Sequence, residues 1–187
     1  PLAATRVEKV AMVARLEYNT KTYGMLAVSL PSDLVPDMEE RSLFWELVGD
    51  IAFGLYKIEV EEQRKQAEHA LSERYKELDC LYSIDMISSR TEFNEQEVCQ
   101  EVVSVLPQAW QYPEVTVARL TLHGKKFETK NYRDTERKQS SDIKIYGVKA
   151  GEVEINYLEK RPELDEGPFL KEKRNLINSI AEQLARI

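Results

Sequence analysis

Alternation of apolar and polar residues marks the first part of the chain as a β-hairpin between residues 10 and 30. A period of two places alternate side chains on one face of a strand. The apolar positions recur every second residue on both sides of the polar turn 19–21: Met12, Ala14, Leu16, Leu26, Val28 and Leu30. The pattern therefore predicts two antiparallel strands with one apolar face.

The spacing of apolar residues changes to three and four after Asp37, which predicts a helix. Asp37 can cap that helix, and Glu39 and Glu40 place negative charge in its first turn. Its apolar stripe is Leu43, Phe44, Leu47, Val48, Ile51, Leu55 and Ile58. Because no proline occurs from Asp37 to about Ser89, we expect one continuous helix of about 50 residues, roughly 75 Å long.

The middle of this helix, residues 59–77, is charged nearly all round. A thin apolar seam remains at sevenfold or near-sevenfold spacing, formed by Val60, Ala67, Leu71, Leu78 and Leu81 and interrupted by Arg64 and Arg74. Heptad spacing is typical of helices that pair, so we expect this helix to form a parallel homodimer and to transmit a signal along it. An isolated charged linker helix is the alternative interpretation.

The second half of the chain predicts a helix, four strands and a closing helix. The first helix spans about 94–106, with Asn94 as its cap, and the strands span 115–122, 126–132, 142–148 and 152–158, with a turn at 149–151 before the last. In the fourth strand Glu152, Glu154 and Asn156 are expected to face water, opposite an apolar face. The closing helix carries Leu176, Ile177, Ile180, Leu184 and Ile187.

A strand-to-helix block occurs twice. Aligning Gly24 with Gly151 superimposes alternate strand positions, and after a longer loop in the second copy the register continues from Arg41 and Arg174 into the helices. We therefore expect two tandem domains of one type. Because the first copy comprises only a hairpin and a helix, we expect the chain to begin partway through that domain.

Composition excludes some classes of function. A net charge of −7 argues against a nucleic-acid-binding surface, which needs clustered Lys and Arg. No apolar run approaches the roughly 20 residues that span a bilayer. The two cysteines and the lack of a signal peptide favour a cytoplasmic location, with the chain as a possible cytosolic part of a membrane-attached sensor.

The expected domain consists of two helices, an antiparallel sheet and a closing helix, and it is repeated, with a charged helix joining the copies. This arrangement resembles the GAF domains of bacterial and archaeal sensor proteins. The motifs that carry the resemblance are Tyr23-Gly-Met-Leu-Ala-Val-Ser-Leu with 43–53, the helical stretch 72–84, and the segments 107–113, 151–157 and 165–177. The resemblance implies an α+β fold in three parts: residues 1–58 from a first GAF-like domain, a coiled-coil linker at 59–77, and a second domain at 78–187.

The resemblance further implies a non-catalytic module of a two-component system that passes its state to an output, such as a histidine kinase, in the same polypeptide. In ligand-binding members, segments between central strands cover a pocket, yet here only 133–141 separate the second and third strands. We therefore expect a reduced relay domain. A GAF sensor that binds a small molecule, a nucleotide or haem is the alternative.

Candidate chemistry is sparse, and we expect no cofactor and no metal site. His69 lies on the long helix but lacks the flanking pattern of a phosphoacceptor, so we interpret it as solvent-facing. Cys80 and Cys99 are redox candidates, with small core residues as the simpler interpretation. Trp110, Tyr112 and Phe169 could line a ligand site, although such aromatic residues more often fill the end of a core.

Overall fold

The computed structural model describes residues 9–31, 35–90 and 94–186 and shows an α+β protein with one long helix and two antiparallel sheets. The chain divides into two compact units, residues 1–68 (unit 1) and 69–187 (unit 2). The long helix α1, Met38–Ser88, contributes residues to both units. The continuous helix expected from the sequence is thus confirmed at 51 residues.

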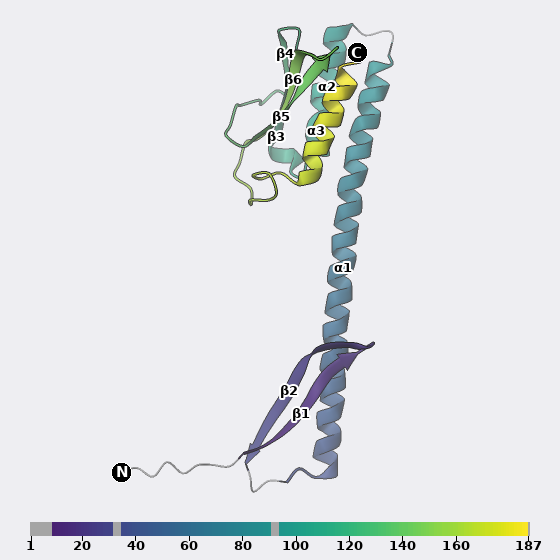
Figure 1. The fold of residues 1–187 in the computed structure, drawn as a ribbon, viewed down its shortest axis with the longest axis vertical. Helices are drawn as coiled ribbons and strands as arrows, with labels where there is room; N and C mark the ends of the chain where they lie inside the picture. Colours follow the sequence, from purple (N-terminus) through teal and green to yellow (C-terminus); the bar gives the residue numbers. More distant parts are fainter. Residues whose placement is uncertain (1–8, 32–34, 91–93, 187) are drawn as a thin grey trace, which may run out of the picture. The chain divides into compact units, whose positions relative to one another are not determined.

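Unit 1 consists of the hairpin of β1 (Lys9–Tyr18) and β2 (Lys21–Pro31) packed along the first part of α1 (Figure 1). One face of the hairpin and one stripe of the helix form a small core of Ala14, Leu16, Phe44, Val48 and Ala52. The predicted cap is also present, because Asp37 Oδ1 accepts a hydrogen bond from the Glu40 amide at 2.8 Å.

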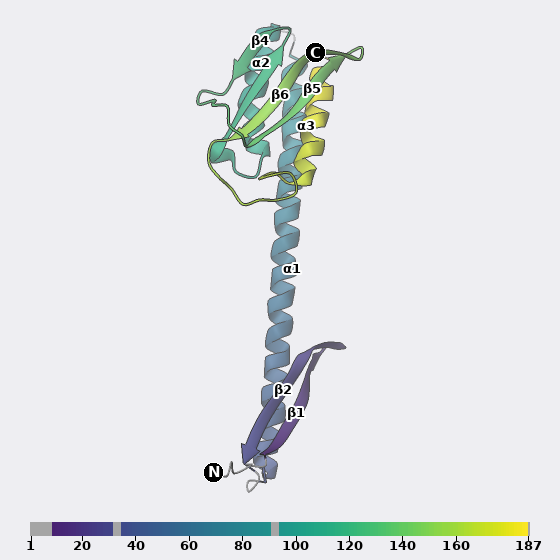
Figure 2. The same cartoon turned by 60° about the vertical axis from the view of Figure 1, so that its left-hand side comes forward.

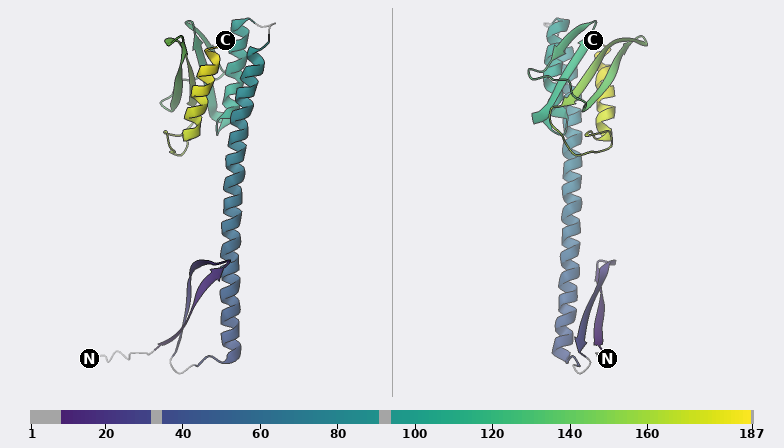
Figure 3. Two further views of the ribbon diagram at one scale, coloured as in Figure 1. Left: turned by 45° about the vertical axis from the view of Figure 1, so that its right-hand side comes forward. Right: turned by 90° about the vertical axis from the view of Figure 1, so that its left-hand side faces the viewer.

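Unit 2 contains a four-stranded antiparallel sheet in the order β4-β3-β6-β5 (Figure 2). Its elements after α1 are α2 (Glu95–Val105), β3 (Thr116–Leu122), β4 (Lys125–Glu128), β5 (Lys138–Ile145), β6 (Val148–Tyr157) and α3 (Lys171–Leu184), with short 3-10 turns at Leu106–Ala109 and Pro113–Val115. Residues 69–88 of α1, together with α2 and α3, lie on one face of this sheet (Figure 3). Asn94 caps α2 as expected, in a reciprocal arrangement with Glu97.

The repeated block of the sequence is confirmed in the backbone of the two hairpins. The ladder of β1 and β2 shifts register after Leu16, which pairs with Gly24, and the ladder of β5 and β6 shifts after Ile143, which pairs with Gly151. Both hairpins close through two residues with positive φ, at 19–20 and at 146–147. The two copies therefore share a strand irregularity and a turn as well as an apolar pattern.

Three predicted strands in unit 2 have wrong boundaries, including the last, β6, which begins at Val148 rather than at 152. β5 runs from 138 to 145 rather than from 142 to 148, and β4 ends at Glu128 rather than at residue 132. The turn lies at Tyr146 and Gly147, not at 149–151. The connection between β4 and β5 is therefore 129–137, as long as predicted but shifted, and Ile187 of the predicted closing helix lies outside the described residues.

The turn was predicted at the wrong place because Gly151, a residue type common in turns, lies within strand β6. A Cβ atom at this position would lie 2.1 Å from the backbone oxygen of Thr121 on β3. Only glycine allows the two strands to approach this closely beside the register shift. The glycine therefore reports close strand contact rather than a change of chain direction.

Candidate functional site

The most unusual residue in unit 2 is Lys173, in the first turn of α3, whose side chain is fully buried. Its Nζ lies 3.1 Å from Oε1 of Glu77 and 2.9 Å from Oε2 of Glu73, both on α1. An isolated ammonium group is costly to remove from water, so the two carboxylates are what make this burial possible. A charged contact thus joins the first and last helices of the unit.

Two further cations complete what we call the Lys173 cluster, which comprises Glu73, Arg74, Lys76, Glu77 and Lys173. Lys76 Nζ donates to Glu73 at 2.7 Å, and Arg74 donates to Glu77 at 2.9 Å. Burial raises the pKa of Glu73, but the hydrogen bonds from Lys76 and Lys173 outweigh this effect and lower the pKa below its ordinary value. The cluster therefore holds Glu73 as a carboxylate.

A second polar contact ties α3 to α1 near the other end of α3. The side-chain amide of Gln183 donates to the backbone oxygen of Leu81 at 3.3 Å. Together with the Lys173 cluster, this bond fixes where the two helices lie along each other, since a shift by one residue would break both. All of these contacts join side chains of the same protein, so the arrangement can hold one helix against another.

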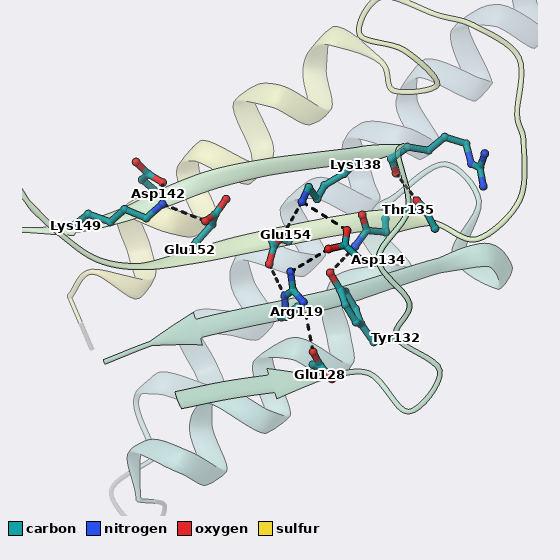
Figure 4. A network of polar contacts seen from close by, with 12 residues as sticks. Arg119, Glu128, Tyr132, Asp134, Thr135, Lys138, Asp142, Lys149, Glu152 and Glu154 are labelled. Atoms are coloured by element: carbon teal, nitrogen blue, oxygen red, sulfur yellow. Dashed lines mark hydrogen bonds and ion pairs between the residues drawn. The ribbon is translucent and has the colours of Figure 1, made fainter. Parts of the chain in front are cut away.

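The outer face of the sheet carries a separate network of charges centred on Glu154 of β6 (Figure 4). Arg119 of β3 donates to Glu154, and Lys138 Nζ of β5 lies 3.3 Å from it. The Arg119 guanidinium also lies 4.6 Å from the centre of the Tyr132 ring. Three neighbouring strands are thereby joined on this face, and the connection 129–137 contributes Tyr132 to the network.

The prediction that Glu154 and Asn156 face water is wrong. These two residues are 5% and 0% exposed, and Asn156 donates to the Tyr132 hydroxyl at 2.8 Å. Burial raises the pKa of Glu154, but the hydrogen bonds and charges of Arg119 and Lys138 outweigh it and lower the pKa. The sequence shows only the alternation of polar and apolar residues in this strand. The residues that bury its polar face, Arg119, Lys138 and Tyr132, come from other parts of the chain.

The three aromatic candidates lie in or beside the core of unit 2. Trp110 and Phe169 are buried, and the Phe169 ring lies 4.5 Å from the ring of Tyr157. Tyr112 packs on the same Tyr157 ring at 5.7 Å. Tyr112 and Phe169 therefore meet around Tyr157, which the sequence did not single out, and their burial agrees with the interpretation that they fill the end of a core.

Both cysteines are buried free thiols, Cys80 on α1 and Cys99 on α2. Burial and the nearby charge of Asp79 raise the pKa of Cys80 to about 12, and burial with Glu95 raises that of Cys99 to about 11. Both thiols are therefore held protonated at neutral pH, the less reactive form. His69 is exposed, as interpreted from the sequence.

Along the predicted seam of α1, Val60, Ala67, Leu71 and Leu78 are exposed, whereas Leu81 is partly buried against the core of unit 2. Within the described ranges, no group of His, Cys, Asp and Glu side chains is placed to hold a metal ion. In the same ranges, no helix is both long enough and apolar enough to cross a membrane.

Sequence reasoning missed Lys173, Glu73 and Glu77. A signal was present for the two glutamates, because they precede Cys80 and Ile84 by seven residues, about two helical turns, and so extend the apolar face of α1 with charge. A charged residue on an apolar face predicts a buried partner. The partner itself lies 96 residues further along the chain, and no local pattern identifies it.

No protein-family model, curated protein or solved structure matches this chain.

Proposed function

We propose that this chain is a non-catalytic relay segment of a signal-transduction protein, related to tandem GAF domains and working in the cytoplasm as a homodimer. Its two GAF-like parts lie at 1–58 and 78–187, joined by the helical linker 59–77. The output is a histidine kinase or another effector domain of the same polypeptide. The resemblance of the repeated block and of the linking helix to such proteins supports this proposal.

The observation that carries the proposal is that α1 belongs to two cores. Phe44, Val48 and Ala52 are buried in unit 1, and Cys80, Ile84 and Ile87 are buried in unit 2. No proline interrupts the helix between these sets. A change in how α1 packs in one unit therefore reaches the other through a continuous backbone rather than through a flexible linker.

The Lys173 cluster supplies the element that such a signal would move. Its buried charges favour one position of α1 against α3, because any other position takes Glu73 and Glu77 away from the fully buried Lys173 ammonium. An interface of this kind has discrete arrangements, which lets a small displacement of one helix produce a defined change.

Insertions in α1 test the relay. The chain is fused at its C-terminus to the dimeric catalytic core of a histidine kinase, and one, two or seven alanines are inserted after Gln66. One or two residues rotate the helix by about 100° each, whereas seven restore its phase to within about 20°. We expect autophosphorylation to change several-fold with one or two alanines and to stay near the parent level with seven.

The matched control places the same insertions after Glu163, in the exposed loop before α3. These variants should phosphorylate like the parent fusion. If insertions after Gln66 also leave the kinase unchanged at every length, the chain does not relay a signal through α1.

A ligand-binding sensor is the second candidate, favoured by a cavity of about 250 Å³ beside the Lys173 cluster. His69, Glu73, Arg74, Glu77, Leu170 and Glu172 are among its lining residues. A thermal-shift screen of nucleotides and metabolites, with a visible spectrum for haem, would favour this candidate if a compound stabilised the chain. Loss of that shift in a His69→Leu variant would place the ligand in this cavity.

A further inference from the structure

An exposed apolar stripe runs along the part of α1 that belongs to unit 2, on the side opposite its core. Leu71, Tyr75, Leu78 and Tyr82 are 56 to 72% exposed. On the other side of the same helix Cys80, Ile84 and Ile87 are buried. At 100° per residue the two sets are centred on opposite sides of the helix. The stripe is therefore not needed for the folding of unit 2.

The spacing of this stripe is that of a coiled-coil seam. Its four residues are separated by four, three and four positions, which places Tyr75 and Tyr82 at a and Leu71 and Leu78 at d of a heptad. The seam predicted from the sequence also used Leu71 and Leu78 but continued to Leu81. Leu81 packs on the core of its own unit, so the structure favours the register through the two tyrosines.

We propose that this stripe is the surface through which a second copy of the chain pairs, with the two α1 helices parallel and in register. The inference rests on the proposed function, since it names the face that forms the proposed homodimer. Across the twofold axis Leu78 meets Leu78 and Tyr75 meets Tyr75 of the second copy. The pairing uses Tyr75 and Tyr82 and leaves Leu81 in its own core.

The charges beside the stripe favour a second copy in this orientation. In this register Arg74 occupies position g of one heptad and Asp79 position e of the next. Parallel helices bring g of one chain near e five residues further along the other, so Arg74 faces Asp79 of the second copy. An antiparallel pair brings e against e and g against g and loses this match.

The stripe spans less than two full heptads, because Glu68 occupies the preceding a position and Asp85 the next d position. Two such aspartates would face each other across the axis and limit the seam at this end. Seams shorter than three or four heptads pair weakly, so the dimer is expected to depend on protein concentration. Asp85→Asn should therefore strengthen it.

Sedimentation of the whole 187-residue chain over a range of concentrations tests the pairing. We expect a reversible dimer for the parent chain and a monomer for Leu78→Lys, with the same far-ultraviolet circular dichroism. Val148→Lys is the matched control, because it places the same charge at an exposed apolar position of β6 and should dimerise like the parent. A parent chain that stays monomeric at every concentration overturns the proposal.

Disulfide trapping tests the register. Under mild oxidation Leu78→Cys should form a covalent dimer, whereas Leu81→Cys and the off-axis Lys76→Cys should not, with the parent chain as the background for the two native thiols. Trapping at residue 81 in place of 78 overturns the proposed face. Asp79→Arg should weaken the dimer about tenfold, whereas Asp79→Glu, which keeps the negative charge opposite Arg74, should pair like the parent.

These results separate the pairing face from the relay. If Leu78→Lys leaves a dimer intact, the face proposed here is wrong, while the insertion experiment on the kinase fusion still decides the relay. If Leu78→Cys traps a dimer and the insertions do not change the kinase, the pairing stands and the relay fails.

Discussion

Lys173 of α3 and Glu77 of α1 form a buried ion pair, 3.1 Å between Nζ and Oε1, although 96 residues separate them. This pair joins the first helix of unit 2 to the last. Glu73 makes a second contact with the same ammonium at 2.9 Å. The position of α1 in the unit is thus fixed by charge as well as by apolar packing, and the contact can be removed without touching the sheet.

Replacing Lys173 by methionine should destabilise unit 2 by about 3 kcal/mol, because two buried carboxylates lose a shared cation. Urea unfolding followed by circular dichroism measures the loss. The control is the triple change Glu73→Leu, Glu77→Leu and Lys173→Met, which removes both buried carboxylates together with the buried ammonium and should recover most of the stability. Unchanged stability in the single variant would show that the cluster is not important for folding.

Stability should also fall in acid. The pKa values of Glu73 and Glu154 are lowered by their cationic partners in the folded chain, and that of Glu166 by hydrogen bonds from Arg174. A lowered folded pKa adds stability above the ordinary value of 4.5, and this stability is lost as the pH falls through the folded pKa. We therefore expect the free energy of unfolding to be steady near neutrality and to decrease below about pH 4.5. In the Glu154→Gln variant the free energy of unfolding should decrease less steeply with falling pH. The same slope in the variant and the parent chain would contradict the role of Glu154.

Gly151 should not tolerate a side chain. Alanine would place Cβ against the Thr121 oxygen, so we expect Gly151→Ala to cost about 3 kcal/mol or to separate β3 from β6. Gly49 offers the opposite case, because a Cβ at this position, in the first third of α1, meets no side chain or other segment within 4 Å. Gly49→Ala should stabilise the chain by about 1 kcal/mol. Thermal unfolding of both variants distinguishes the two effects by sign.

The thiols of Cys80 and Cys99 should react slowly with an aromatic disulfide reagent in the folded chain and rapidly in denaturant. Burial raises their pKa values to about 12 and about 11, so almost no thiolate is present at neutral pH. The absorbance of the released thiol measures both rates. Rapid reaction of either cysteine in the native chain would revive a redox role for it.

The parts of the fold that sequence predicts are those set by local pattern. The hairpin of unit 1, the uninterrupted α1 and the caps at Asp37 and Asn94 each depend on residues a few positions apart. The misplaced turn before β6 shows the limit of such reasoning. Glycine is a residue typical of turns, which is why the sequence placed a turn at Gly151. The position requires glycine for another reason, because the backbone of Thr121 on the neighbouring strand leaves no room for a side chain.

The candidate site was the least predictable part. Glu154 and Asn156 have the alternation of a solvated strand face, and only the approach of Arg119, Lys138 and Tyr132 buries them. Lys173 likewise occupies an ordinary polar position in the first turn of an amphipathic helix. Contacts between residues this distant follow from topology, which local spacing does not contain.

The helix α1 has one more consequence. It closes one hairpin-and-helix block and also supplies the first helix of the next, so consecutive blocks need no separate connector. A chain built in this way can be lengthened by duplicating a whole block. Gene duplication alone would suffice to build longer arrays of such blocks.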